Sequence, residues 1–306
     1  MNAPASSKGS LGLAAVYAYT FGAYVGHAVG GPDWLPPAMA AFAILAMTAI
    51  NLRGAGQAAG IEIAIVAIKL AILGGLAAFG LSQFDAAKLE IAAQPGLAGV
   101  VVGAASVFMA YEGFELVAYD YDEMRDRRRI MGRIMPLAIG SAAVIYVLIA
   151  LAVPMLTGTQ ALIENGEVAL SQAGQAALGT PGLVLVTIAA ALSTASAINA
   201  TLFSSARLAR EVAEDGALPA RIGRRNSHGS PQWAVLALAA LALALAVLGG
   251  LDGLVSGASV VFLLVFGTLN VLAVYENVGS RWVTLPGTIG AFGALTVLLA
   301  HFAGLV

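Results

Sequence analysis

Two glutamates flank a glycine in an otherwise apolar stretch, FMAYEGFELVA, at residues 108–118. Glu112 and Glu115 could form an acid–base pair, but neither a nucleophile nor a metal-ligand set accompanies them, so an enzyme is the least supported interpretation. Gly113 indicates an interrupted helix, because irregular backbone within a membrane is tolerated where it is buried in protein or lines a cavity. The carbonyl groups freed there could bind a cationic ligand. A continuous helix, with Gly113 at a packing contact, is the alternative.

A lysine lies deep in a second apolar stretch. Lys69 follows Ile61 by eight residues, which is about 12 Å along a helix axis and near the middle of a bilayer. Burial disfavours the charged form of a lysine, so Lys69 could bind and release a proton during a working cycle. The alternative is a lysine whose stem snorkels to the headgroups. Glu62, near the edge of the same stretch, is expected at the interface.

A third apolar stretch, LSTASAINATLFSS, carries a high density of polar side chains. Small hydroxyl residues often serve helix packing in membranes, but their number here favours a polar face toward a cavity. The residues concerned are Ser193, Thr194, Ser196, Asn199 and Thr201.

Several kinds of site are excluded by what the chain lacks. It contains no cysteine, which removes disulfides and thiolate ligands, and its three histidines have no metal-binding spacing. His27 is expected to be an interfacial or core histidine. There is no Walker A pattern and no basic tract of the kind that binds nucleic acid. We therefore expect no metal, no cofactor and no nucleic-acid partner.

The elements that must position these residues are membrane-spanning helices. Hydrophobic residues make up 59% of the 306 residues and charged residues only 10%, against about 25% charged residues in a soluble domain. We predict an all-α polytopic membrane protein, with a polar tail at residues 1–10 and a single transmembrane domain at 11–306. The expected spans are 11–29, 36–51, 61–82, 97–119, 134–156, 182–205, 231–250, 254–275 and 283–304.

The loops alternate in charge. Most of the basic residues fall around Arg53, in 125–133, in 207–225 and at Arg281. Since basic loops stay cytoplasmic, the N-terminus is predicted inside and Val306 outside, in a prokaryotic inner membrane. Glycines at 22, 26 and 30 form two overlapping GxxxG steps, which we attribute to packing within the chain rather than to dimerisation.

Three segments together resemble the amino acid–polyamine–organocation superfamily of secondary transporters. FMAYEGFELVA, followed by RDRRRIMGRIMP, resembles the family's sixth helix and the loop after it. INLRGAGQAAGIEIAIVAIKLAIL is similar to its Asn-x-x-Gly junction and fifth helix. STASAINATLFSSARLAREVAEDGALPARIGRRNSHGSP resembles its eighth helix and re-entrant loop. The similarity is greatest to proton-coupled, broad-specificity amino acid transporters.

The resemblance implies two inverted five-helix repeats with an amino acid bound at mid-membrane between two broken helices. At the break around Gly113, it assigns backbone carbonyls of Phe108, Met109 and Glu112 to the substrate's ammonium group. Tyr111 and Phe114 would shape the side-chain pocket.

The resemblance also implies a coupling site. Glu115 would be a conformational or protonation switch. Lys69 would occupy the place of a sodium ion in sodium-coupled relatives and face hydroxyls such as Thr194 and Ser196. Loss of its proton would bias the inward-open state.

The chain departs from the family pattern in two ways. Its first span resembles part of the third helix, so helices corresponding to the first two and the twelfth are not found. We expect a fragment or mis-started form, a chain completed by a partner, or a degenerate permease or sensor that does not transport. In addition, Glu112 stands where many relatives have an uncharged residue, and it could favour cationic substrates.

Overall fold

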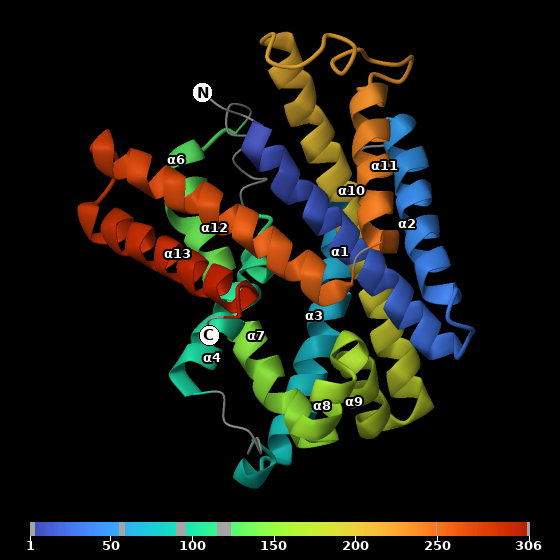
Figure 1. The fold of residues 1–306 in the computed structure, drawn as a ribbon. Helices are drawn as coiled ribbons and strands as arrows, with labels where there is room; N and C mark the ends of the chain where they lie inside the picture. The colour runs from blue at the N-terminus through green and yellow to red at the C-terminus, as the bar shows by residue number, and fades with distance from the viewer. Residues whose placement is uncertain (1–3, 55–58, 90–95, 115–123, 249, 305–306) are drawn as a thin grey trace.

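A computed structural model describes residues 4–54, 59–89, 96–114, 124–248 and 250–304. All regular structure in these residues is helical (Figure 1). The long helices are α1 (Pro4–Val29), α2 (Leu35–Leu52), α3 (Ala59–Ser82), α4 (Gly96–Ser106), α7 (Met135–Thr157), α10 (Thr180–Glu214), α11 (Gln232–Leu248), α12 (Leu251–Tyr275) and α13 (Arg281–Phe302). Shorter elements are η1 (Ala86–Leu89), the 3-10 helix η2 (Phe108–Tyr111), α6 (Arg127–Arg129), a π-helix (Ile130–Ile134), α8 (Thr159–Glu164), η5 (Gly166–Val168) and α9 (Ala169–Leu178).

The prediction of an all-α, multi-pass membrane protein is confirmed. Within the described residues, six helical segments are long and apolar enough to cross a membrane. A seventh, α11, is apolar but shorter. The first and fourth expected spans correspond to α1 and to α4 with η2.

Helix ends differ from the expected spans in three places. α1 begins at Pro4, because a proline is tolerated in the first turn and no stop signal follows, so most of the expected polar tail is helical. α10 continues beyond residue 205 to Glu214, where Arg210 and Glu214 form an i,i+4 ion pair. The loop expected between residues 157 and 181 contains α8 and α9.

Four helices, α1, α2, α10 and α11, pack against one another and contain most of the largest buried cluster. Small residues let them approach closely. A Cβ atom at Gly22 would lie 2.1 Å from the carbonyl oxygen of Pro36, and one at Gly26 would lie 2.6 Å from the Pro36 ring. The first GxxxG step therefore serves the crossing of α1 and α2, as the sequence predicted.

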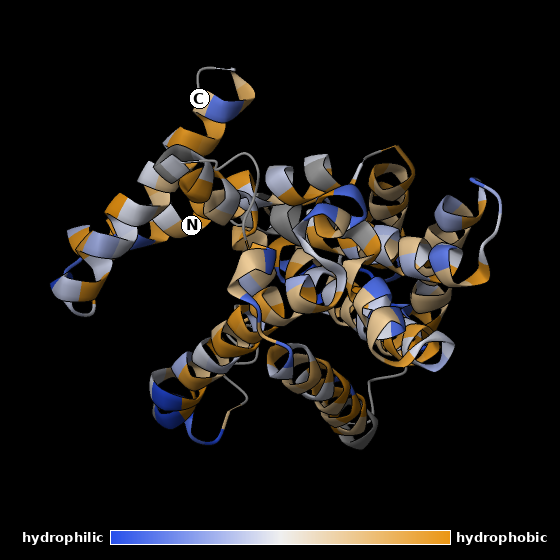
Figure 2. Ribbon diagram, turned by 90° about the horizontal axis from the view of Figure 1, so that it is seen from below, coloured by the Kyte–Doolittle hydropathy of each residue, from blue (hydrophilic) through white to orange (hydrophobic). Residues whose placement is uncertain are grey.

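The remaining long helices attach to this four-helix group through α3 and α12. α3 packs on α7 and α10, while α12 contacts α1, α4, η2 and α13. α12 packs on α1 and α13 packs on α4, whereas the turn that joins the pair lies at the outer edge of the molecule, and the exposed sides of the pair carry many hydrophobic residues (Figure 2). Trp282 and Ile289 are examples, with 91% and 73% of their surface exposed. α12 is therefore the element that joins the four-helix group to the segment around Gly113.

Candidate functional site

The α-helical path of α4 ends before Gly113, in agreement with the predicted interruption, and it ends earlier than the sequence predicted. Residues 115–123, which follow, lie outside the described residues. α4 ends at Ser106, and η2 continues the chain as a 3-10 turn to Tyr111. Glu112 is extended, with ψ at 164°, and Gly113 has a φ of 107°. Among the described residues, no atom lies within 4 Å of a Cβ built on Gly113, so the positive φ is the reason for a glycine here. Glu115 lies outside the described residues.

Side chains from two other helices bind the backbone at this interruption. Ser259 of α12 accepts a hydrogen bond from the Met109 amide at 3.2 Å and donates one to the Ser106 carbonyl at 2.6 Å. Tyr146 of α7 donates its hydroxyl hydrogen to the Ala110 carbonyl at 2.6 Å. The Met109 carbonyl accepts a hydrogen bond from the Glu112 amide at 3.0 Å. The break is thus a defined structure held from both sides.

Aromatic rings cover the side of the break that faces α12. Phe114 stacks on Phe266 with ring centroids 5.2 Å apart, and Phe108 meets the same ring edge-on at 6.3 Å. On the α7 side, Tyr111 packs edge-on against Tyr146 at 5.3 Å. These contacts bring the predicted residues Phe108 and Phe114 together on α12, whereas the predicted Tyr111 packs separately on α7.

Glu112 and Met109 are enclosed to different degrees. Both carboxylate oxygens of Glu112 are buried, although the residue as a whole is only partly buried. Met109 belongs to the main buried cluster with 6% of its surface exposed. Its side chain is therefore a packing element.

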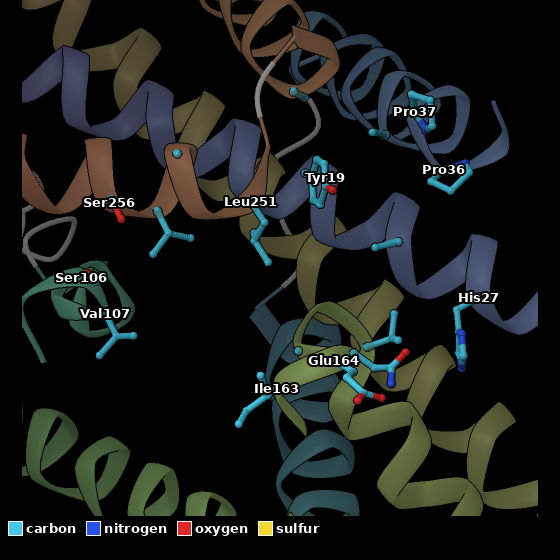
Figure 3. Close-up of a pocket in the computed structure, with 18 of the residues that line it drawn as sticks. Tyr19, His27, Pro36, Pro37, Ser106, Val107, Ile163, Glu164, Leu251 and Ser256 are labelled. Atoms are coloured by element: carbon cyan, nitrogen blue, oxygen red, sulfur yellow. The ribbon is translucent and has the colours of Figure 1, made fainter. Parts of the chain in front are cut away.

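A cavity of about 1270 Å³ reaches the start of the interruption, where Ser106 and Val107 form part of its wall (Figure 3). Its other lining residues come from α1, α2, α8, α11, α12 and α13 and from the segments beside them. His27, Asp33, Glu164 and His301 supply its ionisable groups. The predicted residues at 108–114 adjoin this cavity at Val107 but are not among its lining residues, because the rings of Phe108 and Phe114 pack on α12.

Lys69 bridges α3 and α10. Its Nζ donates a hydrogen bond to Ser193 Oγ at 3.3 Å, and Lys69 and Ser193 are both partly buried. Thr194, expected to face the lysine, instead donates to the Ala190 and Ala191 carbonyls of its own helix, at 2.8 and 3.1 Å. Ser196 is three residues from Ser193 and shares its helix face.

Several polar contacts that join helices here were not predicted from the sequence. Asn51 Nδ2 donates to Asn199 Oδ1 at 2.6 Å in a buried contact between α2 and α10. Asn199 was among the polar residues noted at 193–201, and Asn51 lies in the segment compared with the family's Asn-x-x-Gly junction. These were the sequence features that could have indicated the contact. Ser259 and Tyr146 could not be identified from the sequence, because a single hydroxyl in an apolar helix has no spacing pattern.

The two predicted sites use different helix contacts. Lys69 forms a hydrogen bond to α10, whereas the break forms hydrogen bonds to α7 and α12.

Comparison with known proteins agrees with the resemblance. A family model described as amino acid permease matches residues 6–306. The inner membrane transport protein YbaT of Escherichia coli is 29% identical over 231 residues, 76% of this chain and 54% of that protein. The uncharacterized transporter Rv1999c of Mycobacterium tuberculosis is 30% identical over 261 residues, 83% of this chain and 59% of that protein. This chain thus spans between 54% and 59% of the length of these relatives, and it belongs to the amino acid permease family.

Proposed function

We propose that this chain forms the substrate-binding part of a secondary active transporter of amino acids in a bacterial inner membrane. The observation that carries the proposal is the interruption of α4 at the wall of the large cavity, in a chain of the amino acid permease family. Carbonyl groups released from a helix are suited to a substrate ammonium group. The name of the Escherichia coli relative supports the inner membrane.

In this proposal the backbone at the break binds the ammonium group. Phe108, Met109 and Glu112 offer carbonyl oxygens, and Gly113 permits the backbone path. The Met109 carbonyl accepts one internal hydrogen bond, which leaves a second lone pair for a ligand. Tyr111 and Phe114 shape the pocket for the substrate side chain, with Phe266 stacked behind Phe114.

Proton coupling is assigned to Lys69. Its contact with Ser193 joins α3 to α10 while the ammonium is charged. Deprotonation removes that charge, weakens the hydrogen bond and biases the protein toward the inward-open state. Ser196 on the same face, neighbouring Thr194, and Glu115 beyond the described residues complete the proposed coupling set.

The test is uptake of radiolabelled amino acids by proteoliposomes under an imposed pH gradient. A preceding thermal-shift screen against the twenty amino acids identifies the substrate, since a ligand that binds the folded state raises its apparent stability. We expect inward proton flow to drive accumulation, and Lys69→Ala to reduce this accumulation at least tenfold while leaving amino acid exchange measurable.

Lys88→Ala is the matched control, because Lys88 also makes one hydrogen bond, to the Met155 carbonyl, but lies in η1 beyond the apolar part of α3. It should transport normally. Uptake that ignores the pH gradient, or that survives Lys69→Ala unchanged, would refute the coupling part of the proposal.

A second candidate function is a non-transporting permease homologue, a sensor, or a subunit that works with a partner. It is favoured by the span at Ile130–Thr157, whose most apolar 18-residue window contains no buried residue among those described. Co-purification of a small hydrophobic polypeptide from native membranes, together with no uptake by the isolated chain, would select this candidate.

A further inference from the structure

One hydroxyl group spans the interruption of α4. In a continuous α-helix, the Met109 amide would donate to the Ala105 carbonyl, and the Ala110 amide would donate to the Ser106 carbonyl. In this structure the Ala110 amide donates to the Val107 carbonyl at 2.9 Å instead. This change leaves the Met109 amide and the Ser106 carbonyl without their helical partners. The Ser259 hydroxyl replaces both, since it accepts a hydrogen bond from the Met109 amide and donates one to the Ser106 carbonyl.

Because the surroundings are buried, the hydrogen bonds that Ser259 makes to the backbone matter for stability. Ser259 has 0% of its surface exposed, Met109 has 6% and Ala105 has 3%. An unpaired backbone amide or carbonyl in such a place costs free energy comparable to a lost hydrogen bond. The interrupted form is therefore stabilised by the hydroxyl group that α12 supplies, and removing this hydroxyl takes away the partner of both the Met109 amide and the Ser106 carbonyl.

We propose that Ser259 is a positioning residue that holds residues 107–111 out of the α-helix and so sets the direction of the Phe108 and Met109 carbonyls. Because α12 also packs on α1 and α13, the place of α12 in the membrane determines the shape of the break. The consequence for substrate affinity rests on the function proposed above, whereas the consequence for the backbone does not.

The experiment is amide hydrogen exchange, followed by mass spectrometry, on the full chain in lipid nanodiscs. In Ser259→Ala we expect exchange in residues 106–111 to be about tenfold faster, which corresponds to about 1.4 kcal/mol. Slower exchange would mean that α4 has closed into a continuous helix, and it would equally show that Ser259 holds the break open. Unchanged exchange would overturn the proposal.

Ser259→Thr keeps the hydroxyl and should restore the exchange rate of the unmodified chain. Ser259→Cys retains a side chain of similar size with a weaker donor, and it provides a second, milder loss should the alanine variant not fold. Ser171→Ala is the matched control. It also removes a fully buried hydroxyl, one that pairs with Thr187 between α9 and α10, and it should leave exchange in 106–111 unchanged.

Uptake kinetics separate positioning from general destabilisation. Ser259→Ala should raise the substrate KM about tenfold with a smaller effect on the maximal rate, Ser259→Thr should reverse this, and Ser171→Ala should not change KM. If the exchange result holds but no variant, including the unmodified chain, takes up an amino acid, the proposed function fails while the role of Ser259 stands.

Discussion

Glu112 places a carboxylate beside the carbonyls proposed to bind an ammonium group, and both of its oxygens are buried. Two opposite charges about 4 Å apart interact by about 4 kcal/mol at the effective dielectric constant of a protein surface. If this carboxylate faces the substrate, it should favour amino acids with cationic side chains. If only the Glu112 carbonyl contacts the substrate, the carboxylate should have no effect on this preference.

We expect Glu112→Gln to lower the preference for arginine and lysine over neutral amino acids by roughly tenfold, which is about 1.4 kcal/mol. The measurement is competition of unlabelled amino acids against a labelled substrate in proteoliposomes. Glu214→Gln, at the distant end of α10, is the control for the loss of one carboxylate. An unchanged preference in Glu112→Gln would exclude the side chain from substrate selection.

At the residue scale the sequence predicted the break but not the side chains that support it. Gly113 was recognisable because a glycine between two glutamates is costly in an apolar helix and must have a local reason. Ser259 was not, because its partners Ser106 and Met109 lie about 150 residues away along the chain. The lysine contact depended on the register between α3 and α10, which turned Ser193 rather than Thr194 toward Lys69.

At the scale of the helices, close crossings depend on single small residues. α1 and α2 meet so closely at Gly22 that a Cβ atom there would collide with the Pro36 carbonyl oxygen. Backbone cannot move aside as the end of a long side chain can, so α1 and α2 must separate to admit even one methyl group. Gly74 in α3 is the opposite case, since a Cβ built there meets no atom of the described residues within 4 Å.

Gly22→Ala should therefore destabilise the protein by about 1–3 kcal/mol, the usual cost of overpacking. Gly74→Ala should be tolerated, because alanine is the better helix former where space allows. Thermal unfolding of the purified protein, followed by tryptophan fluorescence, distinguishes the two variants. Equal stability of Gly22→Ala and the unmodified chain would mean that the crossing of α1 and α2 is looser than the structure shows.

Sequence patterns located the long helices better than their ends. Eight of the nine expected spans correspond to a long helix, because an apolar run long enough for a bilayer has few other stable forms. The fourth, 97–119, contains only α4 and η2 among the described residues. The ends depend on local pairing that hydropathy does not report. The Arg210–Glu214 pair extends α10 through polar residues, and the hydroxyl of Ser259 stabilises an early end of α4.

On the scale of the whole molecule, arginines gather toward one end. Figure 1 shows α6 and the segment between α10 and α11 toward one end, and α8, α9 and the turn between α1 and α2 toward the other. The first end carries arginines such as Arg129 and Arg221, whereas the second carries Asp33 and Glu164. This arrangement agrees with the alternation of basic loops along the sequence, and from the positive-inside rule we predict that the first end faces the cytoplasm.

The absence of native cysteine makes this orientation directly testable. Gln83→Cys and Ser227→Cys each place one thiol at an exposed position, after α3 and after α10 respectively. A membrane-impermeant maleimide applied to intact cells should label the first variant at once and the second only after permeabilisation. Three expected spans separate these positions, so they must lie on opposite sides if the predicted topology is correct. Labelling of both or neither in intact cells would require a different number of crossings between them, and the reverse pattern would invert the protein in the membrane.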